Sequence, residues 1–287
     1  MTEPAAPRRA SFGDLRARVL SAIVLIAFAL GALAAGGVWF ILFWLAAALA
    51  VLWEWQNLVG HGARERFVIG GAGIVVAAAL SAQLAPDLAL APLALGAALV
   101  AWRAAPGQRA WAAGGVLYAG ALIVAVAAIR PALAGAIEPP FNLRAILWLF
   151  AVVWGTDVGA YFGGRLIGGP KLWPRVSAGK TWSGAIVGAA AGAALGAVVA
   201  LWRPLAPTPL VPILAVGLAA SIASQLGDLF ESAVKRHFDV KDSSHLIPGH
   251  GGVMDRLDGF VTAAIFVALL GAARGAHSAA EGLLVWN

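Results

Sequence analysis

The stretch from 232 to 258 holds the densest group of charged residues in the chain, between two apolar runs. Its carboxylates come in pairs three residues apart: Asp255 and Asp258 within the stretch, and Asp228 and Glu231 just before it. Residues at this spacing share one face of a helix. Carboxylate oxygens are the ligands that hard cations such as Mg²⁺ prefer. The spacing therefore predicts an oxygen-ligand site for one or two divalent cations.

The alternative for these carboxylates is ion pairing. A lone carboxylate in a membrane helix costs about 2.5–3.5 kcal/mol, so it faces a cavity, an ion or a partner. Glu231 could pair with Lys235, four residues later, and Asp255 with a neighbouring arginine. The two interpretations are equally good for Glu231, whereas for Asp228 and Asp255 we favour the metal role.

Basic residues lie beside the carboxylates, and they suit a substrate that carries several negative charges, such as a phosphate. They are Lys235, Arg236, Lys241 and Arg256. The bend formed by Gly249, His250, Gly251 and Gly252 can aim backbone N–H groups at an oxyanion. A solvated basic loop would also contain lysines, but it would not require interleaved carboxylates and a His-Gly-Gly bend.

A second polar loop, 177–184, places Lys180 between the hydroxyls of Ser177 and Thr181, with glycines at the start of an apolar run. Such a loop suits phosphate at a helix N-terminus. It is not a Walker motif, because the GxxxxGK spacing is missing. The alternative is helix capping by Ser177 or Thr181, with Lys180 at the membrane interface.

The apolar runs that must position these residues indicate a polytopic membrane protein. The chain is 61% hydrophobic and 12% charged, against about 25% charged in soluble domains. Each crossing needs roughly 20 apolar residues, and only helices satisfy the backbone in lipid at these lengths. We therefore expect an all-α fold with about nine transmembrane helices, in the runs 19–35, 38–55, 67–85, 88–102, 110–129, 145–162, 181–202, 210–230 and 259–273. The runs 88–102 and 259–273 are short for a span.

The placement of lysine and arginine predicts the orientation. With the N-terminus inside, the opposite face keeps only Arg130, Arg144, Arg203 and Arg274. We expect a bacterial inner (plasma) membrane protein with a cytoplasmic active site, whose basic face meets anionic lipid headgroups and needs no nucleic acid. The expected parts are a basic segment at 1–18, membrane helices at 19–140, and a catalytic region at 141–287 with cytoplasmic loops 163–180 and 231–258.

This topology puts four carboxylates at one depth near the cytoplasmic interface: Asp157, Asp228, Asp255 and Asp258. They meet if their helices pack together.

Within 181–202, glycines recur every fourth residue, at Gly184, Gly188, Gly192 and Gly196. Such a stripe predicts close helix packing, either inside the fold or between subunits of a homodimer. The chain has no cysteine, which excludes a disulfide framework and a thiolate metal site.

The stretch 232–258 resembles the signature of the phosphatidate cytidylyltransferases, also called CDP-diacylglycerol synthases. The resemblance lies in Ser232-Ala233-Val234-Lys235-Arg236, Lys241-Asp242, Ser244, Ile247-Pro248, His250-Gly251-Gly252-Val253 and Asp255-Arg256-Leu257-Asp258. The segments 157–165 and 228–231 are also similar to the family. The loop 177–184 resembles the family's Ser-Pro-Lys-Lys-Thr-x-Glu-Gly, except at Ala178, Gly179 and Ser183.

The resemblance implies that CTP and phosphatidic acid react to give CDP-diacylglycerol and pyrophosphate, with Mg²⁺ as cofactor and K⁺ as a candidate second cation. Asp228 and Asp255 would hold the cation, with Glu231 and Asp258 beside it. Lys235, Arg236 and Arg256 would neutralise phosphates. The remaining candidates for substrate binding are Ser177, Lys180, Thr181, Lys241, His250, Gly251 and Gly252.

Two other classes remain as alternatives. A secondary transporter also carries carboxylates within its membrane helices, but near the midplane rather than at one interface. A second CTP-dependent lipid enzyme, such as a polyprenol kinase, would use similar groups. Substrate and product analysis separates these classes.

Overall fold

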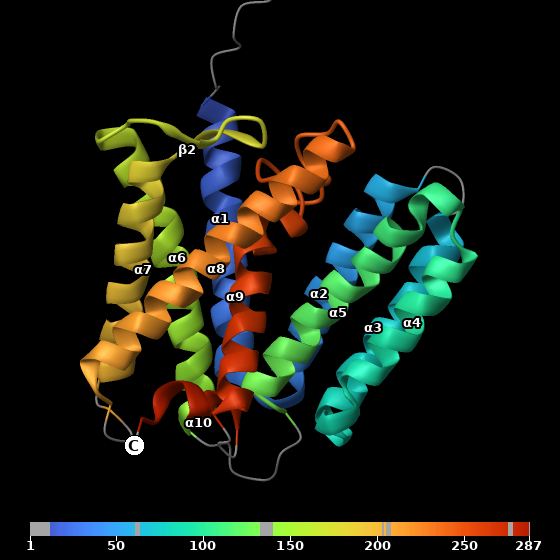
Figure 1. The fold of residues 1–287 in the computed structure, drawn as a ribbon, viewed down its shortest axis with the longest axis horizontal. Coiled ribbons are helices and arrows are strands. Elements are labelled where there is room, and N and C mark those ends of the chain that lie inside the picture. Colours follow the sequence, from blue (N-terminus) through green and yellow to red (C-terminus); the bar gives the residue numbers. More distant parts are fainter. Residues whose placement is uncertain are drawn as a thin grey trace, which may run out of the picture.

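The computed structural model describes residues 12–60, 64–132, 140–202, 204, 208–274 and 278–286, with side chains from 19 onward and from 71 after the first gap. Within these ranges the regular secondary structure is helical apart from one β-hairpin (Figure 1). The helices are α1 (Phe12–Ala35), α2 (Gly37–Val59), α3 (Arg64–Leu84), α4 (Leu90–Arg103), α5 (Arg109–Ile129), α6 (Pro140–Leu166), α7 (Trp182–Leu201), α8 (Leu210–His237), α9 (Met254–Ala273) and α10 (Ala279–Leu284). Residues 1–11 and Arg203, which entered the orientation argument, lie outside the described residues.

The nine predicted apolar runs correspond to α1 through α9, and the all-α membrane class is confirmed. In the described part of the chain, six helices are long and apolar enough to cross a membrane: α2, α5, α6, α7, α8 and α9. The apolar parts described for α1 and α3, Val19–Ala35 and Gly71–Leu84, are shorter. Helix α4 has 14 residues, which is roughly 21 Å against a hydrocarbon layer of ~30 Å. The count of nine spans therefore stays a prediction.

The hairpin is an addition to the expected helices. Strand β1 (Lys171–Trp173) pairs antiparallel with β2 (Ser177–Thr181) inside the predicted loop 163–180. Helix α6 ends at Leu166, and Gly168 and Gly169 follow with φ of 68° and 100°. This left-handed backbone favours glycine and stops the helix. The hairpin then returns the chain directly to the start of α7.

The glycine stripe on α7 packs against α6, as Figure 1 shows for this helix pair. A Cβ atom added to Gly188 would lie 2.7 Å from the carbonyl oxygen of Thr156, and one on Gly184 would lie 2.7 Å from that of Ala160. Gly159 of α6 meets the backbone of Gly188 in return. The predicted close packing is confirmed inside the fold, whereas the homodimer stays a prediction.

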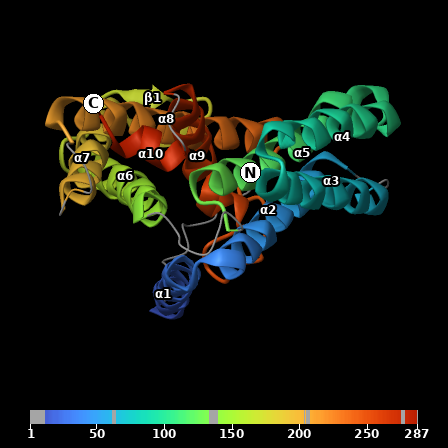
Figure 2. The same cartoon turned by 90° about the horizontal axis from the view of Figure 1, so that it is seen from below.

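The N-terminal and C-terminal helices share one core. The ring of Trp44 on α2 stacks on Phe260 of α9, with ring centroids 4.5 Å apart. Seen from below, α2 and α5 lie beside α9, while α1 stands at the edge (Figure 2). This packing brings the C-terminal end of α2 next to the start of α9.

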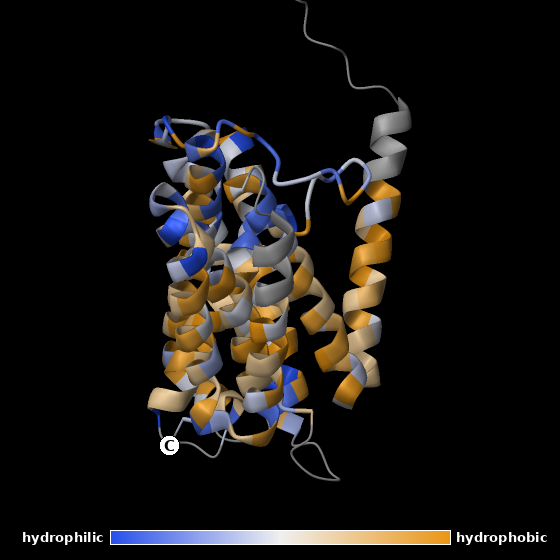
Figure 3. Cartoon of the chain, turned by 90° about the vertical axis from the view of Figure 1, so that its right-hand side faces the viewer, coloured by the Kyte–Doolittle hydropathy of each residue, from blue (hydrophilic) through white to orange (hydrophobic). Residues whose placement is uncertain are grey.

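Polar residues gather mainly at one end of the bundle, where the hairpin and the segment 238–253 lie (Figure 3). Below this end the helices are apolar over most of their length. Helix α1 stands apart from the main bundle in this view, but it contacts the segment 238–253 at the polar end. Ser21 of α1 donates a hydrogen bond to the carbonyl oxygen of Pro248 at 3.1 Å.

Candidate active site

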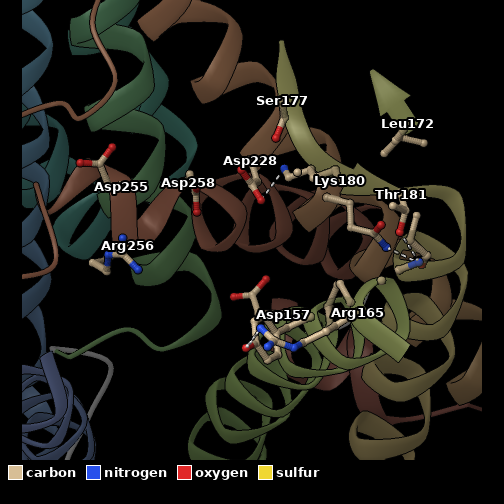
Figure 4. Close-up of a pocket in the computed structure, with 18 of the residues that line it drawn as sticks. Asp157, Arg165, Leu172, Ser177, Lys180, Thr181, Asp228, Asp255, Arg256 and Asp258 are labelled. Atoms are coloured by element: carbon tan, nitrogen blue, oxygen red, sulfur yellow. Dashed lines mark hydrogen bonds and ion pairs between the residues drawn. The ribbon is translucent and has the colours of Figure 1, made fainter. Parts of the chain in front are cut away.

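A cavity of about 630 Å³ opens at the polar end, between α6, α8, α9 and the hairpin. Figure 4 shows the carboxylates of Asp157, Asp228 and Asp258 around a common space, with Asp255 at its edge. The acidic residues that line it are Asp157, Asp228, Asp242, Asp255 and Asp258, and the basic residues are Arg165, Lys180, Lys235 and Arg256. The four carboxylates that were expected to lie together all line this cavity, whereas their depth in the membrane stays a prediction.

Small residues bring the carboxylate-bearing helices together. A Cβ atom on Gly227 of α8 would lie 2.5 Å from the carbonyl oxygen of Asp258, and one on Gly259 would lie 3.0 Å from that of Ser224. Each glycine is the neighbour of a cavity aspartate, Asp228 or Asp258. Close backbone approach at these two positions places both side chains on the same wall.

The second polar loop delivers Lys180 to this wall. Its ammonium nitrogen lies 2.5 Å from Oδ2 of Asp228. Thr181 is the N-cap of α7, because its Oγ1 accepts a hydrogen bond from the N–H of Gly184 at 3.1 Å. The capping alternative is therefore correct for Thr181, which also lines the cavity together with Ser177. Ser183, where the family has glutamate, donates to the carbonyl oxygen of Gly168 and so links the start of α7 to the turn that precedes the hairpin.

Lys235 forms a buried ion-pair group. Its Nζ lies 2.7 Å from Glu231 Oε2, one turn earlier on α8, and 2.6 Å from Asp255 Oδ1. The side chains of Glu231 and Asp255 are only 1% and 4% exposed. The pairing alternative for Glu231 is thus present in the structure. Asp255 pairs with this lysine rather than with a neighbouring arginine, and Glu231 lies outside the residues that line the cavity.

Asp255 also organises the loop before α9. Its Oδ2 accepts hydrogen bonds from the N–H of Gly252 at 2.7 Å and from both the N–H and Oγ of Ser243 at 3.0 Å. Gly251 has a φ of 80°, so the bend needs glycine at this position. Of the predicted N–H groups of the bend, that of Gly252 therefore points at a carboxylate of the protein itself, and that of His250 donates to the carbonyl oxygen of Ile247.

Several of the other predicted residues line a second cavity of about 600 Å³, formed by the segment 241–251 and Arg256. Lys241, His245, His250, Gly251 and Arg256 are among its lining residues. Asp242 and Arg256 line both cavities. Arg236 lines neither; its Nη1 donates to the carbonyl oxygen of Val240 at 2.9 Å.

Sequence reasoning missed Glu54, a fully buried carboxylate on α2. Its two oxygens accept hydrogen bonds from Ser243 and Ser244 and from the N–H groups of Val253 and Met254. These partners lie about 190 to 200 residues away, so no local pattern shows them. The available signal was an ionisable residue inside an apolar run.

The carboxylates that line the cavity fit a magnesium ion that takes its other ligands from a substrate. Asp157, Asp228 and Asp258 line the cavity from three helices. Among the residues that the structure describes, no three Asp, Glu or His side chains lie close enough together to surround an ion. Mg²⁺ commonly takes one or two protein carboxylates and completes its octahedron with water and phosphate oxygens. The cavity matches that arrangement and is not a closed protein cage.

The fold and the cavity define a helical membrane protein with a charged site at one end of its spans. The chain belongs to the Cytidylyltransferase family, whose model matches residues 16–273; it is therefore an enzyme. A protein of Brucella suis biovar 1 (strain 1330) named phosphatidate cytidylyltransferase is 43% identical over 261 residues, 90% of this chain and 94% of that one. A protein of the same name from Pseudomonas aeruginosa is 37% identical over 90% of this chain and 98% of its own length. The resemblance found in the signature is thereby confirmed.

Proposed function

We propose that the protein transfers the cytidylyl group of CTP to phosphatidic acid, giving CDP-diacylglycerol and pyrophosphate for phospholipid synthesis. The observation that carries this proposal is the 43% identity to a phosphatidate cytidylyltransferase over 90% of the chain. The site supports it, because several residues that resemble the family signature line one charged cavity at the polar end of membrane helices. They are Lys235, Asp242, Asp255, Arg256 and Asp258.

In the proposed reaction, a phosphate oxygen of phosphatidic acid attacks the α-phosphorus of CTP, and the bond from that phosphorus to pyrophosphate breaks. The attacking phosphate is already ionised, so the step needs no general base. Catalysis then depends on positioning and on neutralising charge. Lys180, Arg165 and Arg256 line the cavity and supply positive charge to the phosphates.

Mg²⁺ is the proposed cofactor, with Asp228, Asp255 and Asp258 as its candidate ligands. All three line the cavity, as does Asp157 on the facing helix α6. Bound there, it would neutralise charge on the phosphate oxygens. Asp255 must give up one of its present hydrogen bonds to bind directly. Glu231, the fourth predicted ligand, instead holds Lys235 in this proposal. A K⁺ ion as second cation also stays a prediction.

The proposed location is the bacterial inner membrane, with the cavity on the cytoplasmic side. The placement of lysine and arginine supports this orientation. The cavity lies at the end of membrane-length helices. Phosphatidic acid would enter sideways from the bilayer, while CTP would arrive from the cytoplasm.

The test is a labelled assay with the purified protein, phosphatidic acid and Mg²⁺. With CTP labelled at the α-phosphate, the label is expected in the lipid; with CTP labelled at the γ-phosphate, it is expected in pyrophosphate. A lipid kinase would move the γ-label to the lipid and release CDP. Appearance of the γ-label in the lipid would refute the proposal.

A further inference from the structure

Glu54 makes an unusual contact between distant parts of the chain. It lies on α2, in the N-terminal half, and its side chain is fully buried against the loop that precedes α9. Oε1 accepts from Ser244 Oγ at 2.7 Å and from the N–H of Val253 at 2.8 Å. Oε2 accepts from the N–H of Met254 at 2.6 Å. It also lies 3.1 Å from Ser243 Oγ, whose single hydrogen is shared between Glu54 and Asp255.

These hydrogen bonds replace a missing helix cap. Val253 is the N-cap of α9, and its own side chain makes no capping hydrogen bond. The first N–H groups of a helix need acceptors, and a carboxylate there also interacts favourably with the helix dipole. Glu54, on another helix, supplies the acceptor oxygens and the negative charge at this end of α9. It thereby fixes where α9 begins, one residue before Asp255.

The same carboxylate and Asp255 hold the loop between them. Ser243 Oγ lies 3.1 Å from Glu54 Oε2 and 3.0 Å from Asp255 Oδ2. Gly252 donates its N–H to Asp255 at 2.7 Å. A Cβ atom on Gly252 would lie 2.6 Å from both oxygens of Glu54. Glycine is therefore needed at 252 by the close approach of Glu54.

We propose that Glu54 is a positioning residue of the active site, which holds the segment 241–253 and the first turn of α9 so that Asp255, Arg256 and Asp258 face the cavity. The N-terminal helices then act on catalysis as well as anchoring the protein. The kinetic part of this inference rests on the proposed function, whereas its structural part does not.

Gln56 offers a matched control on the same helix. It is also buried, at 2% exposure, and it donates through Nε2 to the carbonyl oxygen of Ala112 on α5 at 3.1 Å. Gln56→Met removes one buried hydrogen bond that does not involve the loop. Glu54→Gln keeps the side-chain volume, but its amide nitrogen cannot accept from the donors that face it.

The experiment measures amide hydrogen exchange of the full chain in lipid nanodiscs, together with thermal unfolding and steady-state kinetics. In Glu54→Gln, exchange of the segment 241–256 is expected to rise about tenfold or more, because charge-assisted hydrogen bonds are lost. The kcat is expected to fall about 10- to 100-fold, since small misplacements of catalytic groups cost that much. Both Glu54→Gln and Gln56→Met should lower the melting temperature, because each removes buried hydrogen bonds. Only Gln56→Met should keep the native exchange of 241–256 and the native kcat.

Unchanged exchange of 241–256 in Glu54→Gln would overturn the inference, whatever the activity. Faster loop exchange with native kcat would overturn the catalytic part. If wild-type protein forms no CDP-lipid, the proposed function fails, but the exchange result still tests the contact. Should Glu54→Gln not fold, Ser244→Ala removes a single donor to Glu54, and exchange should then rise within 241–256 alone; native exchange there would count against the contact.

Discussion

Lys235 offers a sharp test, because one ammonium group balances two buried carboxylates. Its Nζ lies 2.7 Å from Glu231 and 2.6 Å from Asp255, and the lysine side chain is itself only 12% exposed. Lys235→Met would leave both carboxylates buried without their cation. Removing one partner of a buried ion pair typically costs about 3–5 kcal/mol. We expect a loss of unfolding free energy in this range.

A second change tests the cause. The double variant Lys235→Met/Glu231→Gln removes one of the two stranded charges, so it should recover part of the lost stability. Asp255 keeps its donors from Ser243 and Gly252. Activity should stay low in both variants, because Lys235 also lines the cavity.

The measurement is unfolding of the detergent-solubilised variants, with the same substitution at an exposed lysine as control. Lys171 is exposed on β1, and Lys171→Met should change stability by less than about 0.5 kcal/mol. Native stability of Lys235→Met, or a double variant no more stable than the single one, would refute the ion-pair reasoning.

Three further predictions concern packing, orientation and capping. Gly188→Ala should cost about 1–3 kcal/mol by separating α6 from α7, whereas Ala190→Leu, on an exposed position of the same helix, should be tolerated in thermal unfolding. A cysteine at His245 should react with an impermeant thiol reagent only after lysis of spheroplasts, and one at Pro209 before lysis; the reverse pattern contradicts the orientation. Thr181→Val should lose about 1 kcal/mol with the cap of α7, while Thr181→Ser should keep it, as measured by denaturant unfolding.

The helices were predictable because their signal is local. Runs of apolar residues of membrane length specify helices whatever their neighbours are. The glycine stripe that includes Gly188 likewise predicted a close helix contact, although the sequence did not show that the partner is α6. The hairpin was missed because a polar loop with no apolar alternation gives no strand signal, although Gly168 and Gly169 marked the end of α6.

The site was predictable where topology decides it and not where tertiary contacts decide it. Asp157, Asp228 and Asp258 were expected at one depth because their spans enter and leave at the same face. Glu231 had two equally good interpretations, and its spacing from Lys235 on α8 already allowed the ion pair. Only the packing of α8 on α9 shows that the same lysine also pairs with Asp255. Glu54 had no local indication of its partners, because they lie on the loop before α9.

The central claim is that the carboxylate-lined cavity is where CTP reacts with the lipid phosphate. Its most direct test is CDP-lipid formation against Mg²⁺ concentration for Asp228→Asn, with thermal unfolding of the same preparation. Asparagine keeps the size of the side chain and an acceptor for Lys180, but it removes the negative charge of a proposed Mg²⁺ ligand. We expect that most activity is lost, that the remaining activity needs more Mg²⁺, and that folding is nearly unchanged. Native turnover with an unchanged Mg²⁺ curve would contradict it.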